Sequence, residues 1–234
     1  MRREVRPELL DALPPDDSQA VGSRKDLRRL NLIMGHANVL SRASLRHLNA
    51  RPLRSQPLRV VELGSGDGTL LLQIARRLAM AGMTGQVTLL DRQNLVSDET
   101  RRGFTALDWS VDIVTIDVFS WLNQSTQVAD VMFANLFLHH FTDEQLKVLL
   151  QQAMARSNLF IACEPQRSLL ALAACRLIWL IGCNHTTRHD AVISVRAGFV
   201  SQELSALWPT NTHWELAEKR IGLFSHSFIA KQNA

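Results

Sequence analysis

The residues from Val60 to Thr69 read V-V-E-L-G-S-G-D-G-T and combine one acid with three closely spaced glycines. Gly64, Gly66 and Gly68 follow an apolar run, and Glu62 lies two residues before the first glycine. Because glycine has no Cβ and tolerates a positive φ, its backbone can come close to a ligand. The pattern predicts a cofactor site in a turn between a strand and a helix.

The spacing of the glycines distinguishes between two kinds of nucleotide-type cofactor. The dinucleotide fingerprint G-x-G-x-x-G places a pyrophosphate on a helix N-terminus, whereas here the spacing is G-x-G-x-G and Thr69 stands where the third glycine would be. A carboxylate beside the turn suits a ligand with a cationic amine and no phosphate, such as S-adenosylmethionine. The chain fills every position of the motif acid-x-Gly-x-Gly-x-Gly, and so it resembles the class I (Rossmann-like) S-adenosylmethionine-dependent methyltransferases. The resemblance implies S-adenosyl-L-methionine as cofactor, S-adenosyl-L-homocysteine as product, and Ser65, Arg92 and Asn135 as further residues of the cofactor site.

Two more acids end later apolar runs. Asp91 closes the run that begins at Gln86, and Asp117 closes the run that begins at Val111. A carboxylate at the end of the second strand can accept hydrogen bonds from both ribose hydroxyls. The resemblance therefore assigns Asp91 to the ribose, and Asp117 with Val118 to the adenine. The competing interpretations are a helix cap or loop charge for Asp91 and a solvated turn acid for Asp117.

The segment from Asn135 to Phe141 reads N-L-F-L-H-H-F and resembles the region after the fourth strand in many small-molecule methyltransferases. His140, and with lower preference His139, is a candidate general base because an imidazole has a suitable pKa. The competing interpretation is a capping or packing histidine. No metal site is expected, because adjacent histidines on an irregular turn do not easily chelate one ion and no spacing matches a zinc or iron site. Glu164, after the fifth strand, suits either a substrate contact or a structural acid.

A second polar cluster runs from His185 to Phe199 and contains His189, Asp190 and Arg196. It suggests an active-site lid in which His189 is another candidate base, although a salt-bridged loop explains it equally well. The sequence of this cluster resembles that of methyltransferases which accompany bacterial type III polyketide synthases and act on phenolic lipids. The resemblance implies O-methylation of a small, hydrophobic phenolic or polyketide-type metabolite. The alternatives are C-methylation of a quinone-type lipid precursor, a non-catalytic S-adenosylmethionine-binding adaptor, and a nicotinamide oxidoreductase.

The elements that must position these residues alternate between strand and helix patterns. Apolar runs at 58–61, 86–91, 111–117, 130–134 and 159–163 predict strands, two more strands are expected near 213–219 and 223–230, and helices are expected at 70–81, near 94–106 and at 143–156. Such alternation indicates an α/β fold with right-handed crossovers. The resemblance makes it Rossmann-like and doubly wound, with a mostly parallel seven-stranded sheet, helices on both faces and an N-terminal helical cap. We expect a cap segment at 1–57 and a methyltransferase domain at 58–234 with an insertion, the lid, at about 166–210.

Two segments outside the motifs carry their own predictions. Residues 1–23 contain a Pro-Pro-Asp-Asp patch and are expected to be loosely attached, while 24–49 predict one or two helices with a kink at Gly35. Residues 168–183 are apolar on nearly all faces but too short to span a bilayer. We expect a buried cap helix there. The alternatives are that the segment lines a hydrophobic substrate pocket or contacts a membrane.

Composition is that of one globular enzyme. The 234 residues are 46% hydrophobic and 21% charged, and the net charge is +4. Residues 1–59 hold 12 Lys/Arg against 6 Asp/Glu, so the excess of positive charge is N-terminal; a solvated helical face is the favoured explanation, and the absence of aromatic residues in its basic part argues against nucleic acid. Three apolar-flanked cysteines and the charged start predict reduced thiols in a cytoplasmic protein. A small hydrophobic substrate is expected as partner, with a peripheral membrane contact and a homodimer left open.

Overall fold

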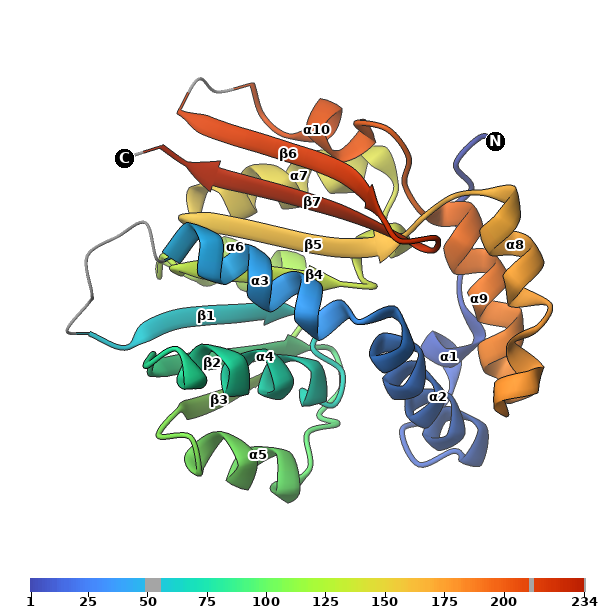
Figure 1. The fold of residues 1–234 in the computed structure, drawn as a ribbon, viewed down its shortest axis with the longest axis horizontal. Coiled ribbons are helices and arrows are strands. Elements are labelled where there is room, and N and C mark those ends of the chain that lie inside the picture. The colour runs from blue at the N-terminus through green and yellow to red at the C-terminus, as the bar shows by residue number, and fades with distance from the viewer. Residues whose placement is uncertain (49–55, 211–212, 234) are drawn as a thin grey trace.

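A seven-stranded sheet organises the protein (Figure 1), in a computed structural model that describes residues 1–48, 56–210 and 213–233. The strand order is β3-β2-β1-β4-β5-β7-β6, in which β1 to β5 pair in parallel and β6 and β7 are antiparallel. This confirms the predicted α/β fold and its mostly parallel sheet. The strands are β1 (Leu58–Leu63), β2 (Gly85–Asp91), β3 (Ser110–Thr115), β4 (Val131–Asn135), β5 (Leu159–Pro165), β6 (Trp214–Ile221) and β7 (Ser225–Gln232).

Helices cover both faces of the sheet, and each face has its own hydrophobic core. One core packs side chains of α3, α4 and α5 against the sheet, and the other packs α6, α7 and α10 against the opposite face. Strands β4 and β5 are buried along their whole length, as expected for central strands of a doubly wound sheet. The helices on these faces are α3 (His36–Leu48), α4 (Thr69–Met80), α5 (Asp98–Thr105), α6 (Val118–Gln124), α7 (Asp143–Ala155) and α10 (Glu203–Leu207).

The remaining helices lie together beyond the carboxyl ends of the parallel strands (Figure 1). Helix α9 (His185–Ala197) packs against α1 (Leu9–Ala12), α2 (Ser18–Met34) and α8 (Leu169–Cys175). Two short 3-10 turns, η1 (Leu138–His140) and η2 (Ile178–Ile181), complete this end of the molecule. Ligands of parallel sheets bind beyond these strand ends, so the N-terminal segment and the 166–210 insertion meet where a cofactor and an acceptor are expected.

The structure corrects several sequence predictions. Residues 1–12 are not loosely attached, because Arg3 donates to the carbonyls of Ala197 and Phe141, and the carboxylate of Asp190 accepts from the backbone of Leu9 and Leu10. The Pro-Pro-Asp-Asp patch ends instead in Asp17, which caps α2. The cluster at 185–199 is mostly the regular helix α9 rather than a loop.

The apolar stretch 168–183 is also not one buried helix. It forms two short elements, α8 and η2, and six of its large apolar side chains are exposed. The third strand ends at Thr115, and Asp117 caps α6, a helix that the sequence analysis did not predict. The predicted helix at 24–49 is divided at Gly35, as expected, into α2 and α3; Asn49 lies outside the described residues.

The cysteines and the helix lengths agree with expectation. Cys163, Cys175 and Cys183 are all buried free thiols, and burial raises the pKa of each. Among the helices of the described ranges, none combines the length and the apolarity needed to cross a bilayer.

Candidate active site

The glycine turn connects β1 to α4 and leaves room beside one of its glycines. Gly64, Gly66 and Gly68 all have positive φ, at +66°, +54° and +71°. A Cβ on Gly64 would lie 2.1 Å from the ring of Phe137, so that glycine is required by packing. At Gly66, in contrast, no heavy atom lies within 4 Å of an added Cβ. Backbone is therefore presented to open space at Gly66, as a ligand-binding turn requires.

Glu62 is a buried carboxylate with an unused oxygen. It lies at the end of β1, is 2% exposed, and its Oε2 has no hydrogen-bond partner among the described residues. Burial raises the pKa of Glu62 well above its usual value, and the nearby carboxylates Asp67 and Asp91 raise it further. Leaving such an oxygen unpaired is costly, and a cationic group bound beside it would both satisfy the oxygen and favour the ionised form.

Three further buried side-chain atoms have no hydrogen-bond partner by distance and angle among the described residues. They are Ser65 Oγ, Asn135 Oδ1 at the end of β4, and Nδ1 of His36 at the start of α3. The last two belong to side chains that interact with each other: burial lowers the pKa of His36 to about 4, against the opposing effects of a hydrogen bond with Asn135 and of Glu164, so its imidazole is neutral at pH 7. Of the five such atoms among the described residues, only Trp208 Nε1 belongs to a residue outside this group. Buried donors and acceptors of this kind fit the binding of a polar ligand.

The predicted ribose and adenine residues follow the turn along the sheet edge. Asp91 Oδ2 accepts a hydrogen bond of 2.9 Å from the backbone of Gly66, so the end of β2 holds the glycine turn directly. Arg92 next to it is exposed, with its guanidinium 3.8 Å from Asp11. Asp117 uses Oδ1 to cap α6, and Val118 is the buried first residue of that helix. Asp117 is therefore a helix cap, a role that the sequence analysis did not consider for it, and its adenine contact stays a prediction.

Helix α2 contributes two residues that the sequence analysis missed. Arg28 forms an ion pair of 3.0 Å with Asp67 in the glycine turn, and Asn31 Oδ1 accepts a hydrogen bond of 3.2 Å from Asn135 Nδ2. The cap helix is thus joined to the turn and to the end of β4. Nothing in the local pattern of α2 marks these two polar residues, because their role depends on how the helix docks.

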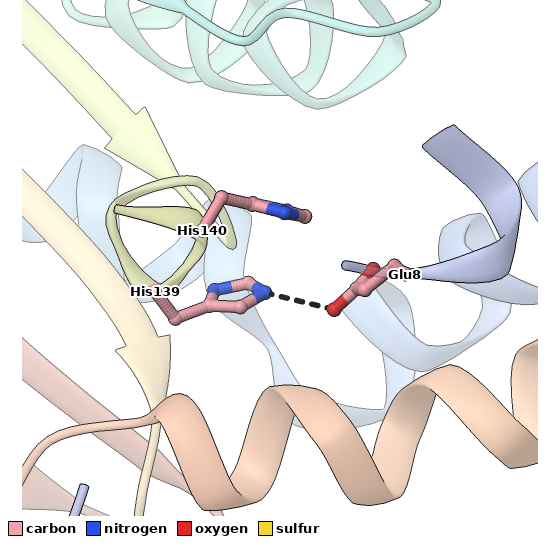
Figure 2. Close-up of side chains that lie close together, drawn as sticks. All are labelled: Glu8, His139 and His140. Carbon is pink, nitrogen blue, oxygen red and sulfur yellow. Dashed lines mark hydrogen bonds and ion pairs between the residues drawn. The ribbon is translucent and has the colours of Figure 1, made fainter. Parts of the chain in front are cut away.

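A buried histidine lies between two carboxylates just after β4, and Figure 2 shows one of the two, Glu8. His139 Nδ1 is 2.8 Å from Glu164 and Nε2 is 3.3 Å from Glu8. Glu164, fully buried at the end of β5, also accepts from the backbone of Phe137 and Leu138. Burial alone would lower the pKa of His139, but the hydrogen bonds to Glu164 and Glu8 outweigh burial and raise it to about 9. His139 is therefore an imidazolium at pH 7 in this arrangement and donates from both nitrogens.

Glu8 reaches this place from the N-terminal segment, 131 positions away in sequence. It lies just before α1, and Ser194 of α9 donates to the same carboxylate. Although burial opposes ionisation, the hydrogen bond from His139 lowers the pKa of Glu8. Figure 2 shows the rings of His139 and His140 projecting from η1 towards Glu8. Sequence reasoning missed Glu8, since it expected this segment to be loose.

His140 lies beside His139 but at the surface of the cluster. Its ring is tilted by 31° against that of His139, its side chain is 24% exposed, and Nδ1 is 3.4 Å from Asp11. The hydrogen bond to His140 lowers the pKa of Asp11. Glu8, His139 and His140 offer ligand atoms within 4.8 Å of one another, so these three side chains are the group in the described chain that could hold a metal ion.

His189, the other predicted base, lies on α9 and is 45% exposed. Its Nδ1 is 3.0 Å from Asp190, whose carboxylate also fixes the N-terminal segment. The structure therefore brings His139 and His140 together with Glu8, and it leaves His189 on the neighbouring helix with a different carboxylate.

The comparisons with known proteins concern the domain and the fold. Residues 60–157 match the sequence family described as a methyltransferase domain. A search of curated protein sequences finds no significant match. Among solved structures, the chain is similar to an O-methyltransferase family protein from Burkholderia thailandensis, with a TM-score of 0.60, 18% identity, and coverage of 95% of this chain and 64% of that one.

Two other similar structures contain the reaction product. The plantazolicin methyltransferase BpumL, in complex with S-adenosylhomocysteine, has a TM-score of 0.61 and 12% identity, with 93% of this chain and 91% of that chain covered. The magnesium protoporphyrin IX methyltransferase of Synechocystis PCC 6803, with the same ligand, has a TM-score of 0.53 and 12% identity, with 96% and 91% covered. The chain thus spans less than two thirds of the first protein but most of the other two. At these identities the structural likeness establishes the fold.

The matched residues 60–157 begin within β1 and contain the glycine turn, Asp91, Asp117 and the histidine pair. The sheet order and the position of the glycine turn agree with that match. The chain therefore contains a match to the methyltransferase-domain family over residues 60–157, on the fold of the solved methyltransferases to which it is similar.

Proposed function

We propose that the protein is a class I S-adenosylmethionine-dependent methyltransferase that transfers the methyl group to the oxygen of a small, hydrophobic phenolic or polyketide-type molecule. The observation that supports this most directly is the histidine held by Glu164 at the end of β4, because a hydroxyl acceptor has a proton to lose. The aromatic side chains beside it suit a flat ring: Phe137 and Phe119 both lie edge-on to Phe141, at 5.0 and 5.5 Å between ring centroids.

The cofactor site would extend from the glycine turn along the sheet edge. Glu62 and Asn135, with their unpaired oxygens, would receive the cationic amine of S-adenosylmethionine, and the backbone at Gly66 would approach the ligand. Asp91 would accept from the ribose hydroxyls, and Asp117 with Val118 would meet the adenine. The bound cofactor supplies a methyl group already activated on a sulfonium, so the transfer itself requires mainly positioning and exclusion of water.

His139 is the proton acceptor that the geometry favours over His140 and His189. Glu164 holds its Nδ1–H and would stabilise the imidazolium formed when Nε2 takes the hydroxyl proton. As the oxygen–carbon bond forms, the sulfur–methyl bond breaks, and the sulfonium becomes the neutral thioether. The acceptor hydroxyl would take the place that Glu8 has at Nε2, which removes one of the two carboxylates that keep His139 protonated.

We further propose that α1 and α2 act with the 166–210 insertion as the cover of this site. Helix α9 supports the arrangement, because Ser194 contacts Glu8 and Asp190 holds the start of α1. Through this cover, the N-terminal part of the chain brings Glu8 and Asn31 to the strand ends.

A labelled methyl donor with a panel of alkylated phenols, water-soluble phenols and quinone-type rings tests the proposal. We expect O-methylated products and a preference for the alkylated phenols. A product methylated on carbon, or no turnover of any phenol, would contradict it.

Matched histidine variants test the base. His139→Asn should lower kcat by about 10²- to 10⁴-fold, whereas His140→Asn should change it only a few-fold. The loss in His139→Asn should shrink with acidic phenols such as nitrophenols, because these need less help in losing the proton. An equal loss for all phenols would mean that His139 serves structure alone.

A further inference from the structure

An exposed apolar surface lies on the helices beyond the strand ends, and its composition is unusual. It is formed by α8 and η2 together with the end of α2. Trp179 is 54% exposed, Leu180 62% and Leu32 71%. Monomeric proteins rarely expose large apolar side chains in a continuous group unless the group binds something. The exposed apolar residues of this surface are Leu32, Ile33, Leu169, Leu170, Leu177, Trp179, Leu180 and Ile181.

The two parts of this surface are joined by a direct contact. Arg29 of α2 donates a hydrogen bond of 3.1 Å to the carbonyl of Ile181 in η2. Leu32 and Ile33 are three and four residues beyond Arg29, and side chains at that spacing share one helix face. The exposed end of α2 therefore continues the apolar surface of η2.

Basic residues predominate around the apolar surface, and of these Arg28 is paired with Asp67 and Arg29 with Asp26. The ranges 18–33 and 168–189 contain six Lys/Arg and a single acid, Asp26, which is buried. Its carboxylate is used internally, by Arg29 and by the backbone of Asn184. The basic residues of the two ranges are Arg24, Lys25, Arg28, Arg29, Arg176 and Arg188.

We infer that this apolar–basic surface binds the face of an anionic lipid bilayer. Leucine, isoleucine and tryptophan side chains enter the boundary between headgroups and acyl chains, and Lys/Arg around them attract anionic headgroups. Because α8 and η2 are short, they lie on the bilayer rather than span it. A second copy is disfavoured as the occupant, because a two-fold contact through the same surface would bring the basic residues of both copies together.

Vesicle sedimentation with the full chain tests the inference. The protein should bind vesicles of phosphatidylcholine with phosphatidylserine at about a third of the lipid, bind phosphatidylcholine alone much more weakly, and be released by salt. The tryptophan emission should shift to the blue on binding, because Trp109, Trp208 and Trp214 are already buried while Trp179 is exposed. No binding to the anionic vesicles would overturn the inference.

Paired variants separate the two contributions. Trp179→Ser/Leu180→Ser should weaken binding by about tenfold or more, and Arg176→Glu/Arg188→Glu should do so on the anionic vesicles only. The control Met80→Ser/Val148→Ser removes two apolar side chains exposed elsewhere and should bind as the unmodified chain does. Unchanged binding in the first variant would refute the assignment.

Sedimentation equilibrium without lipid identifies the other occupant. We expect that this surface does not mediate dimerisation of the chain. A dimer that Trp179→Ser/Leu180→Ser dissociates would show that a second copy covers the surface, and would overturn the lipid assignment. Because neither experiment measures methyl transfer, failure here leaves the proposed acceptor untouched.

Discussion

The pairing of His139 with two carboxylates should make the stability of the protein depend on pH between about 6.5 and 9. The pKa of His139 rises from 6.5 to about 9 on folding. Each unit of difference between the folded and the unfolded pKa corresponds to about 1.4 kcal/mol. Because the folded pKa is the higher one, this contribution is fully present below pH 6.5 and is lost as the pH rises through 9. It amounts to about 3 kcal/mol.

Chemical denaturation at several pH values measures this loss, and a matched pair of variants isolates it. Glu8→Gln removes one carboxylate from His139, so its unfolding free energy should fall less steeply with pH than that of the unmodified protein. Glu4→Gln, in the same segment but paired only with the exposed Arg6, should keep the original dependence. His36 is present in both proteins and contributes equally to them, so the difference between the two pH dependences reports on His139.

Direct titration of the imidazole by NMR provides the second measurement. The signal of His139 should titrate near pH 9 in the unmodified protein and at a lower pH in Glu8→Gln. If Glu8→Gln and the unmodified protein show the same pH dependence by both methods, the coupling between Glu8 and His139 is refuted.

Three further outcomes are expected. Gly66→Ala should bind S-adenosylmethionine at least about tenfold more weakly, because the added Cβ would occupy the space into which the ligand is proposed to bind. Gly82→Ala is the control, since Gly82 has a φ of +78° and similarly open surroundings and the substitution bears the same backbone strain. Equal affinity of the two variants by calorimetry would contradict the turn assignment. Asp91→Ala should weaken cofactor binding by about 10- to 100-fold with less effect on saturated turnover, and an unchanged dissociation constant would remove it from the ribose role. Thr142→Ala should lower the unfolding free energy by about 1 kcal/mol, because it removes the capping box of α7; a melting temperature that does not change would show that the box contributes nothing.

The sheet and the glycine turn were predictable from sequence because their signals are local. Glycine spacing, apolar runs and strand-end acids each reflect a few neighbouring residues, and the strands β1, β2, β4 and β5 lie where those runs are. The capping box at Thr142 is equally local, and the structure confirms it. Helix α6 was missed because it has only seven residues and begins inside what reads as a strand end.

The parts that could not be predicted depend on contacts between distant segments. Whether residues 1–12 are loose or fixed is decided by Arg3 and by Asp190, which no local pattern connects. In the same way, an apolar stretch reads as buried whether or not another element covers it. That ambiguity produced the wrong prediction for 168–183, where six large apolar side chains are exposed.

The attachment of the N-terminal segment also determines when the active site can be completed during synthesis. Glu8 leaves the ribosome early, but Ser194, one of its partners, follows 186 positions later. At about 5–20 residues per second, that interval lasts about 10 to 40 seconds. Strands β1 to β5 have left the ribosome by then, whereas β6 and β7 follow Ser194, so the contact that fixes Glu8 beside His139 is completed late in synthesis, shortly before the sheet itself.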